Sequence, residues 1–304
     1  MTGFLCEESY MADKITITCL INNEVLFGPS VWGEHGLSWL IETPQTQLIF
    51  DTGSSAEVLA HNLKVLKKSL RRLSHIVLSH GHYDHTGGLP HLLSIASRRL
   101  CLVAAPQVFE AKYSVQRGSL LRSIGIPMRE EEVRERTDVI LSNEPIQIVA
   151  GVTFSGRIPL TVDFETPLSH FLCRRGDELL VDPFDDDRAL FIQTTEGLVV
   201  LLGCGHSGLI NTLREGRRLF DRPIVAVMGG SHLAPASEER LKSTIQTLQE
   251  EFPEIQTYRL NHCTGNKAQF ALHTAFGERV KPFLAGEKMS FQAIGEQTKQ
   301  KEGS

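Results

Sequence analysis

The sequence predicts a fold that combines β-sheets with helices, and three observations predict it. The chain opens with short apolar runs separated by turn residues, a pattern typical of antiparallel strands with short connections: 15–21, 37–41 and 47–50. Further along, apolar runs of strand length alternate with helical stretches. The composition, 41% hydrophobic and 22% charged over 304 residues, allows a sizeable core to be buried.

The next elements place a polar hexapeptide between a strand and a helix. Asp51-Thr-Gly-Ser-Ser55 follows the third strand, and the apolar spacing over 58–70 predicts a helix. A short strand at 75–79 then runs directly into His80, and a second helix is predicted over 89–97. A strand end is a rigid mount for side chains that must be held in fixed positions.

The rest of the chain predicts more strands, a cap and a tail. Strands are expected at 146–149, 178–181, 189–193, 198–202, 223–228 and 257–260. The polar, helix-prone stretch from about 106 to 175 is expected to form a cap-like insertion over the site. Ser237 is expected to cap a helix that runs to Glu251. We expect one domain over 1–285 and a flexible tail over 286–304, where the periodicity is lost.

Charge and composition exclude several classes of partner. The net charge is −5 and no dense basic run occurs, which argues against nucleic acid as the primary partner. No stretch of 18 apolar residues exists, so no transmembrane helix and no membrane partner are expected. No signal peptide is evident, and the six cysteines form no CxxC pair. These features predict a cytoplasmic protein with reduced thiols. They leave the oligomeric state open.

The hexapeptide His80-Gly-His82-Tyr-Asp84-His85 predicts a metal site. Imidazole nitrogens suit zinc, iron and similar metals, and a carboxylate adds a harder ligand. Four ligands within six residues do not fit comfortably around one tetrahedral ion. We therefore expect His80 and His82 to bind one metal, and Asp84 and His85 to bind a second.

Two further histidines follow predicted strands in the same way. His206 lies in Gly203-Cys-Gly-His-Ser-Gly208 and His262 in Asn261-His-Cys-Thr-Gly265. Since ligands gather at one edge of an α/β sheet, both are expected to join the metal site. His232, after another strand, is open between metal or substrate contact and a structural role. The remaining histidines lack such a context and are expected to have no role in the site: His35, His61, His75, His91, His170 and His273.

Three neighbours of these ligands carry expectations of their own. Asp51 ends a buried strand, and a buried carboxylate needs partners. We expect it to hold the histidine loop, with capping of a turn as the alternative. Cys204 and Cys263 stand beside the histidines. Adjacent residues on an extended chain point to opposite faces, so both are expected to be packed thiols rather than ligands.

With Asp51-Thr-Gly upstream and strand-end histidines downstream, His80-x-His82-x-Asp84-His85 resembles the metallo-β-lactamase superfamily over residues 15–285. Glu34-His-Gly-Leu-Ser38, Gly203–Gly208 and His262–Gly265 are similar to a dihydropterin synthase-like subgroup, whose archaeal members are said to join a dihydropterin to a ribofuranosyl-aminobenzene phosphate. The resemblance implies the α+β class, a four-layer αββα sandwich, and a dinuclear site. It carries six ligands over to this chain: His80, His82, Asp84, His85, His206 and His262. The superfamily's bridging Asp has no match here, and Arg157-Ile-Pro159 stands about where a further His would fall.

The leading functional prediction is metal-assisted hydrolysis. Two divalent metal ions, zinc in the first place with iron or manganese as alternatives, would activate water against an ester, phosphate ester or lactam bond of a small molecule. The catalytic residues would be Asp84 and His232, and the general acid would be either His232 or a water molecule. One alternative is a transferase acting on a pterin-like (pyro)phosphorylated substrate. Another is a non-hydrolytic di-iron or ligand-binding protein. Basic and aromatic side chains of the insertion would suit an anionic substrate: Lys112, Tyr113, Arg117, Arg122 and Arg157. The alternative is that the arginines are simply solvated at the surface.

Overall fold

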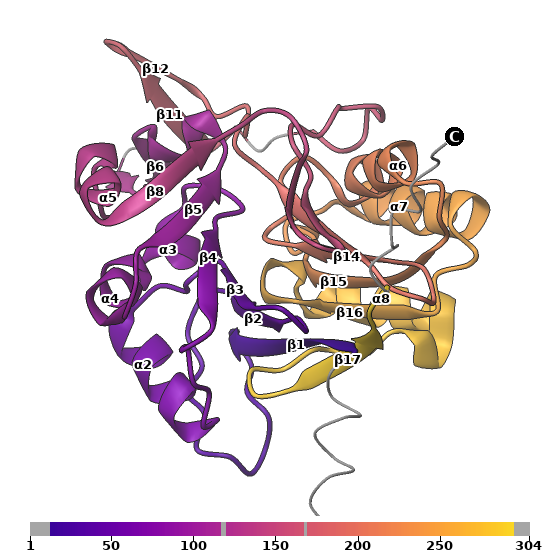
Figure 1. Cartoon of the computed structure of the whole chain (residues 1–304). Coiled ribbons are helices and arrows are strands. Elements are labelled where there is room, and N and C mark those ends of the chain that lie inside the picture. The colour runs from indigo at the N-terminus through magenta and orange to yellow at the C-terminus, as the bar shows by residue number, and fades with distance from the viewer. Residues whose placement is uncertain (1–12, 117–119, 167–168, 295–304) are drawn as a thin grey trace, which may run out of the picture.

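Two large β-sheets face each other in the computed structural model, which describes residues 13–116, 120–166 and 169–294 (Figure 1). The first sheet has the order β17 (Lys288–Gln292), β1 (Lys14–Ile21), β2 (Ser38–Glu42), β3 (Gln47–Phe50), β4 (Leu73–Val77), β5 (Leu100–Ala104) and β8 (Thr137–Leu141). The second has the order β16 (Thr257–Asn261), β15 (Ile224–Gly230), β14 (Leu198–Leu202), β13 (Ala189–Gln193), β10 (Val152–Phe154) and β9 (Ile146–Val149).

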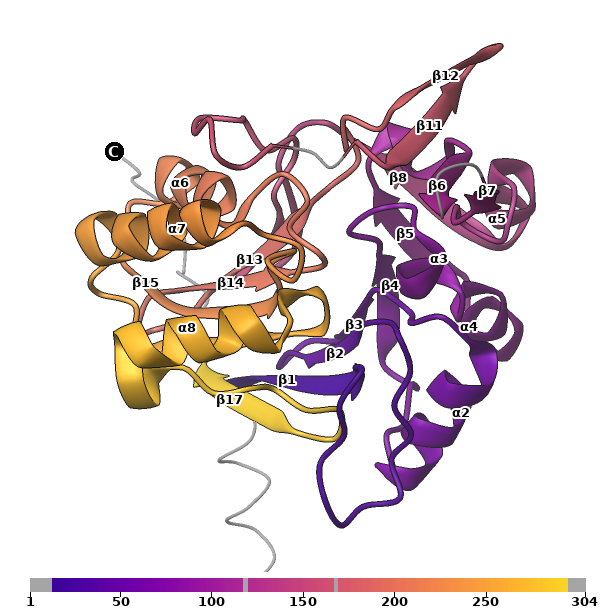
Figure 2. The same cartoon turned by 180° about the vertical axis from the view of Figure 1, so that it is seen from behind.

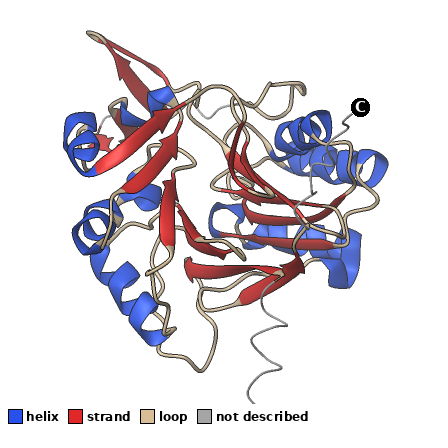
Figure 3. Ribbon diagram, viewed as in Figure 1, coloured by secondary structure: helices blue, strands red, loops and turns tan. Residues whose placement is uncertain are grey.

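Helices cover the outer face of each sheet (Figures 1, 2 and 3). The first sheet carries α2 (Ala56–Val65), α3 (Tyr83–Thr86), α4 (Leu89–Ile95) and α5 (Glu130–Arg136). The second carries α6 (Leu209–Leu219), α7 (Glu238–Glu251) and α8 (Asn266–Phe276). The short 3₁₀ turns are η1 (Pro106–Phe109), η2 (His262–Thr264) and η3 (Gly277–Arg279). The predicted αββα sandwich is therefore confirmed.

Three apolar clusters hold these layers together. One lies between the two sheets and includes Trp39, Phe50 and Phe154, all fully buried. The others fill the spaces between each sheet and its helices. A strand that packs on both faces needs a nearly continuous apolar sequence, as β14 (LVVLL, buried throughout) has. The sandwich thus follows from strands that are apolar on two faces.

The observed cap is smaller than the stretch 106–175 that the sequence predicts. A separate small sheet pairs β6 (Lys112–Gln116) and β7 (Leu120–Ser123) with β11 (Phe171–Arg175) and β12 (Glu178–Val181). The strands between these two hairpins belong to the large sheets, where β8 pairs with β5 and β10 with β13. The prediction of one continuous insertion is therefore wrong, because the chain returns to both sheets between its two parts.

The predicted tail is also wrong in part. Lys288–Gln292 form β17, which pairs antiparallel with β1, and Phe291 is 4% exposed in the core between the sheets. In β17 only every other side chain faces the core, and an alternation over five residues is a weak signal of a strand in the sequence. The stretch 295–304 of that prediction lies outside the described residues. Ser237 caps α7 as predicted, accepting from the backbone N–H of Arg240.

No helix among the described residues has both the length and the apolar character needed to cross a membrane.

Candidate metal centre

The candidate residues lie where four strands end at one edge of the two sheets. β4 leads to His80, β14 to His206, β15 to His232 and β16 to His262. β3, β4 and β5 run parallel in the first sheet, and β14, β15 and β16 run parallel in the second. Because carboxyl ends of parallel strands meet at one edge, residues distant in sequence are brought together. The structure thus brings together all the predicted ligands and His232.

His80, His82 and His206 form the first group, and their ring nitrogens lie within 4.8 Å of one another. Each Nε2 atom is buried and has no hydrogen-bond partner. Burial lowers the pKa of His82 to about 3 and lowers the pKa of His80 and His206 well below the ordinary value. The three imidazoles are therefore neutral, and each has a ring nitrogen close enough to the others to bind one shared ion. Buried polar atoms without partners are costly, and a metal ion would satisfy all three.

Asp84, His85 and His262 form the second group. The Asp84 Oδ2 atom lies 3.4 Å from His262 Nε2 and 3.8 Å from His85 Nε2. Burial raises the pKa of Asp84, but the neighbouring histidines more than offset this and hold it well below its usual range. The carboxylate is therefore ionised and faces imidazole nitrogens, a donor set that suits a divalent ion.

Asp51 orients ligands of both groups. Its Oδ2 atom lies 2.7 Å from His85 Nδ1 and accepts from Ser79 Oγ at 2.6 Å, while its Oδ1 atom accepts from the Ser79 backbone N–H. The Ser79 hydroxyl in turn lies 2.8 Å from His80 Nδ1. Partners on Nδ1 leave Nε2 to face the centre, as in metal sites where a carboxylate orients a ligating histidine. The contact with the histidine loop that the sequence predicts for Asp51 is present.

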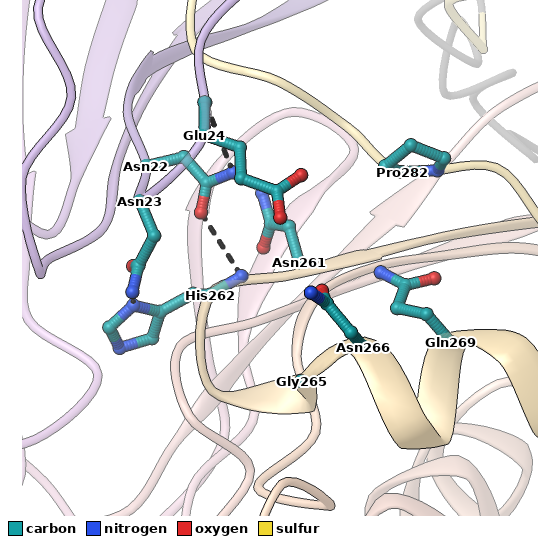
Figure 4. Close-up of a pocket in the computed structure, with 9 residues that line it drawn as sticks. All are labelled: Asn22, Asn23, Glu24, Asn261, His262, Gly265, Asn266, Gln269 and Pro282. Atoms are coloured by element: carbon teal, nitrogen blue, oxygen red, sulfur yellow. Dashed lines mark hydrogen bonds between the residues drawn. The ribbon is translucent and has the colours of Figure 1, made fainter.

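Two asparagines in the loop after β1 hold His262 in place. The His262 backbone N–H donates to Asn22 Oδ1 at 3.0 Å, and its Nδ1 lies 2.7 Å from Asn23 Oδ1 (Figure 4). These contacts fix a backbone with φ of 49°, a conformation that non-glycine residues seldom adopt. The side chain is 1% exposed. His262 is thus held by one contact to its backbone and one to its ring.

The family model of the metallo-beta-lactamase superfamily matches residues 31–220. The chain belongs to this superfamily. Its curated relatives include the 7,8-dihydropterin-6-methyl-4-(beta-D-ribofuranosyl)-aminobenzene-5'-phosphate synthase of Methanocaldococcus jannaschii, which is 28% identical over 92% of this chain and 97% of its own length. An uncharacterized protein of the same organism is 30% identical over 78% of this chain and 86% of its own length.

Solved structures of the superfamily agree with this fold. Tm1679, described as a metal-dependent hydrolase of the beta-lactamase superfamily, matches with a TM-score of 0.79 at 28% identity, over 91% of this chain and 99% of its own. The metallo-beta-lactamase fold protein YhfI from Bacillus subtilis matches with a TM-score of 0.54 at 13% identity, over 91% and 100%, which supports the fold alone.

Two further residues at strand ends, His232 and Cys204, lie beside these groups in this superfamily member. His232 has both ring nitrogens buried without a partner, and its backbone N–H donates to Cys263 Sγ at 3.3 Å. Cys204 is 3% exposed, and its Sγ lies 3.1 Å from His85 Nε2. Cys204 is buried, as expected of a packed thiol, but the expectation that the two cysteines point away from the histidines is wrong, because both sulfur atoms lie within clusters of potential ligands.

His35 is a member of the site that the sequence did not indicate. Its Nε2 atom lies 3.2 Å from Asp84 Oδ2, and together with His262 it forms a third cluster of potential ligands. Its loop lies against the hexapeptide because Gly36 has no side chain, and a Cβ there would be 2.8 Å from the Asp84 carbonyl. In the sequence, the Glu34-His-Gly36 motif is the feature from which a place for His35 in the site could have been predicted. The other histidines expected to have no role are absent from these clusters among the described residues.

A cavity of about 180 Å³ opens over the two groups. Its wall includes Tyr83 and, from the small sheet, Ser114, Arg122 and Phe171. The Arg122 guanidinium lies 4.8 Å from the centre of the Tyr83 ring. A cationic side chain at a cavity of this kind can pair with an anionic group of a ligand.

The other side chains proposed for anion binding lie elsewhere. Lys112 is 1% exposed and contacts Asp182 at 2.7 Å and Asp186 at 2.9 Å. Arg157 contacts Asp185 at the surface. Tyr113 faces Arg174, and Arg117 lies outside the described residues. Only Arg122 therefore remains as a described candidate for that role.

Proposed function

We propose that this protein is an enzyme with two divalent metal ions that acts on a small anionic molecule. His80, His82 and His206 would bind one ion, and Asp84, His85 and His262 the other. The observation that carries the proposal is the pair of adjacent ligand groups, in which four buried Nε2 atoms have no hydrogen-bond partner: those of His80, His82, His206 and His262. The nitrogen-rich donor set favours zinc, with iron or manganese as alternatives.

We propose hydrolysis as the reaction, at an ester, phosphate ester or lactam bond. Bound metal ions supply Lewis-acid polarisation and an activated water at neutral pH. Arg122 would pair with an anionic group of the substrate from the cavity wall. His232, which lines the same cavity, would donate a proton to the leaving group. Asp84 would hold its metal ion with one oxygen that also contacts His35.

A transferase is the second candidate, and a specific observation favours it. A relative that aligns along nearly its whole length is named a synthase, so the reaction of this chain would join two molecules rather than add water. Tm1679, at the same identity of 28%, is described as a hydrolase. The two relatives therefore support different reaction classes for this chain.

The metal content tests the shared part of both proposals. Protein purified without added metal is expected to contain close to two transition-metal ions per chain by elemental analysis. The variant His82→Ala is expected to lose at least one ion and most activity on a panel of phosphate esters, phosphodiesters, thioesters and lactones. His91→Ala, on α4 and outside both groups, is the matched control. A metal-free protein with an unaffected His82→Ala variant would refute the proposal.

The fate of isotopically labelled water separates the two reactions. Hydrolysis places the labelled oxygen in a product. A transferase acting on a pyrophosphorylated substrate releases pyrophosphate, and its products carry no label. Products formed with unlabelled oxygen and released pyrophosphate would replace the hydrolase proposal by the transferase.

A further inference from the structure

Cys204 lies at the point where the two ligand groups meet. Its sulfur atom clusters within 4.8 Å with His80 and His85, and separately with His206 and His232 and with His262 and Cys263. It therefore adjoins two ligands of the first group and two of the second. Cys204 occurs in three of the five clusters of potential ligands among the described residues, more than any other residue.

The nearby carboxylates do not take this central position. Asp84 joins only the cluster with His35 and His262, which contains no ligand of the first group. Asp51 contacts the Nδ1 side of His85, away from the Nε2 atoms. Asp186 and Asp187 accept from the backbone N–H groups of Gly81 and Ser207. Within the described part of the chain, no carboxylate joins His80 or His206 in such a cluster.

The distance between Cys204 Sγ and His85 Nε2 agrees with that expected for two ligand atoms of one metal ion. Zinc–sulfur and zinc–nitrogen bonds of about 2.3 and 2.0–2.1 Å place the two ligand atoms roughly 3.1–3.6 Å apart for bond angles between about 90° and 110°. The observed distance is 3.1 Å. A thiolate also has several lone pairs and is a strong ligand for zinc and cobalt.

We propose that the Cys204 thiolate is a ligand shared by both metal ions. This inference rests on the dinuclear site proposed above. On binding, the S–H bond breaks, the proton passes to solvent, and sulfur–metal bonds form without any change of oxidation state. The shared sulfur would do what a bridging carboxylate otherwise does, which is to hold two cations close together by a common negative charge.

Cys263 offers a matched control. Its sulfur clusters with Cys204 and His262 only, and it is already engaged, since it accepts from the His232 backbone N–H and contacts the Cys204 carbonyl oxygen at 3.5 Å. It therefore lies at one end of the site rather than between the groups. In either Cys→Ser variant an oxygen atom replaces the sulfur, and the two substituted positions lie close together in the site.

Cobalt titration of the metal-free protein tests whether Cys204 is a ligand. Cobalt(II) bound to a thiolate has a sulfur-to-metal charge-transfer band in the near ultraviolet. We expect the wild-type band to grow with both equivalents of cobalt and to persist in Cys263→Ser. In Cys204→Ser the band should be lost, and the second equivalent should bind at least about 10-fold more weakly.

X-ray absorption of the zinc-loaded Cys263→Ser protein tests whether the sulfur is shared, and it does not depend on the folding of Cys204→Ser. A shared thiolate gives on average one zinc–sulfur contact per zinc at about 2.3 Å. A ligand of one ion only gives half a contact per zinc, which would overturn the sharing.

The remaining outcomes separate this inference from the proposed function. Two cobalt ions bound without a sulfur band would overturn the role of Cys204 and leave the dinuclear enzyme intact. A band that disappears in Cys263→Ser and persists in Cys204→Ser would assign the ligand to Cys263. A wild-type protein that binds no cobalt would refute the proposed metal centre itself.

Discussion

His85 differs from the other buried histidines in its electrostatic surroundings. Burial lowers its pKa, but the Asp51 and Asp84 carboxylates and the contact with Asp51 more than offset this and raise the pKa to about 9. In the metal-free protein His85 is therefore protonated at neutral pH. The proton occupies the place that a metal ion would take, so metal and proton compete for the same nitrogen.

This competition predicts how the stability of the metal-free protein changes with pH. The folded-state pKa is raised above the unfolded value of about 6.5, so the bound proton stabilises the fold fully below pH 6.5. That stability, a few kcal/mol, is lost as the pH rises through about 9. Urea unfolding of metal-free protein at pH 6.5 and pH 9.5 should show the decrease.

Asp51→Asn is the control, because it removes one of the two carboxylates that raise the pKa of His85. In this variant the decrease should be smaller and should occur at lower pH. The pKa values of His80, His82 and His206 are lowered, so these residues contribute changes below pH 6.5 and leave this window unaffected. A wild-type stability that rises or stays constant between pH 6.5 and 9.5 would contradict the assignment.

The sequence places the four side chains of the hexapeptide close together because they are local in the chain. That His206 and His262 lie beside them could be predicted because each follows a strand. His35 was not predictable, since its contact with Asp84 depends on how the loop after β1 folds back on the site. The position of Cys204 depends on the turn at Gly205, whose φ of 63° breaks the extended geometry that the prediction assumed.

Between the elements, Lys112 connects the small sheet to the metal loop. It pairs with Asp182 and Asp186, and Asp186 accepts from the backbone N–H of Gly81 within the hexapeptide. Burial lowers the pKa of Lys112, but the two carboxylates outweigh this and raise it. The strand β6 is thereby tied to the loop that presents His80 and His82.

Lys112→Met is expected to lower the free energy of unfolding by about 3–5 kcal/mol, because it leaves two buried carboxylates without their cation. Urea denaturation measures the change. The double variant Lys112→Met/Asp182→Asn should lose less than the single variant. Lys288→Met, on the exposed face of β17, should change the stability little. Equal losses in the single and double variants would show that the ion pairs are not the cause.

β17 is the element that sequence reasoning placed wrongly. Its alternation is only five residues long, and one of its side chains, Phe291, is buried in the central core. The large sheets were predicted more reliably, because strands such as β14 are apolar throughout. The divided cap was missed because short strands within a polar stretch carry little apolar signal.

Phe291→Ala is therefore expected to destabilise the protein by about 3–5 kcal/mol through the cavity it leaves. Gln292→Ala, exposed on the same strand, should have an effect within about 0.5 kcal/mol. Thermal or urea unfolding of both variants provides the measurement. Similar small effects of the two substitutions would mean that β17 adds nothing to the core.

Across the whole molecule, the proposed ligands come from both halves of the sandwich. The hexapeptide follows β4 of the first sheet, whereas His206 and His262 follow strands of the second. A metal ion held by residues of both sheets would link the two halves at one edge. Its binding energy would then contribute to the stability of the folded chain.

Removal of metal is expected to lower the melting temperature. At a free metal concentration 100-fold above the dissociation constant, binding to the folded state adds about 2.7 kcal/mol. For a chain of this size that corresponds to a shift of roughly 4 °C. Differential scanning calorimetry with and without a chelator measures it. The double variant His80→Ala/His206→Ala keeps only the second ligand group and should show a smaller shift, and a chelator effect of undiminished size in it would place the metal elsewhere.

The pairing of β1 with β17 also sets an order of events during synthesis. β1 lies between β2 and β17 in the first sheet, so one edge of it stays unpaired until residues 288–292 have left the ribosome. An open strand edge is a template for pairing with other chains. Of the described strands, β1 is made first and is among the last to be covered, so the growing chain carries an open strand edge until β17 can pair with it.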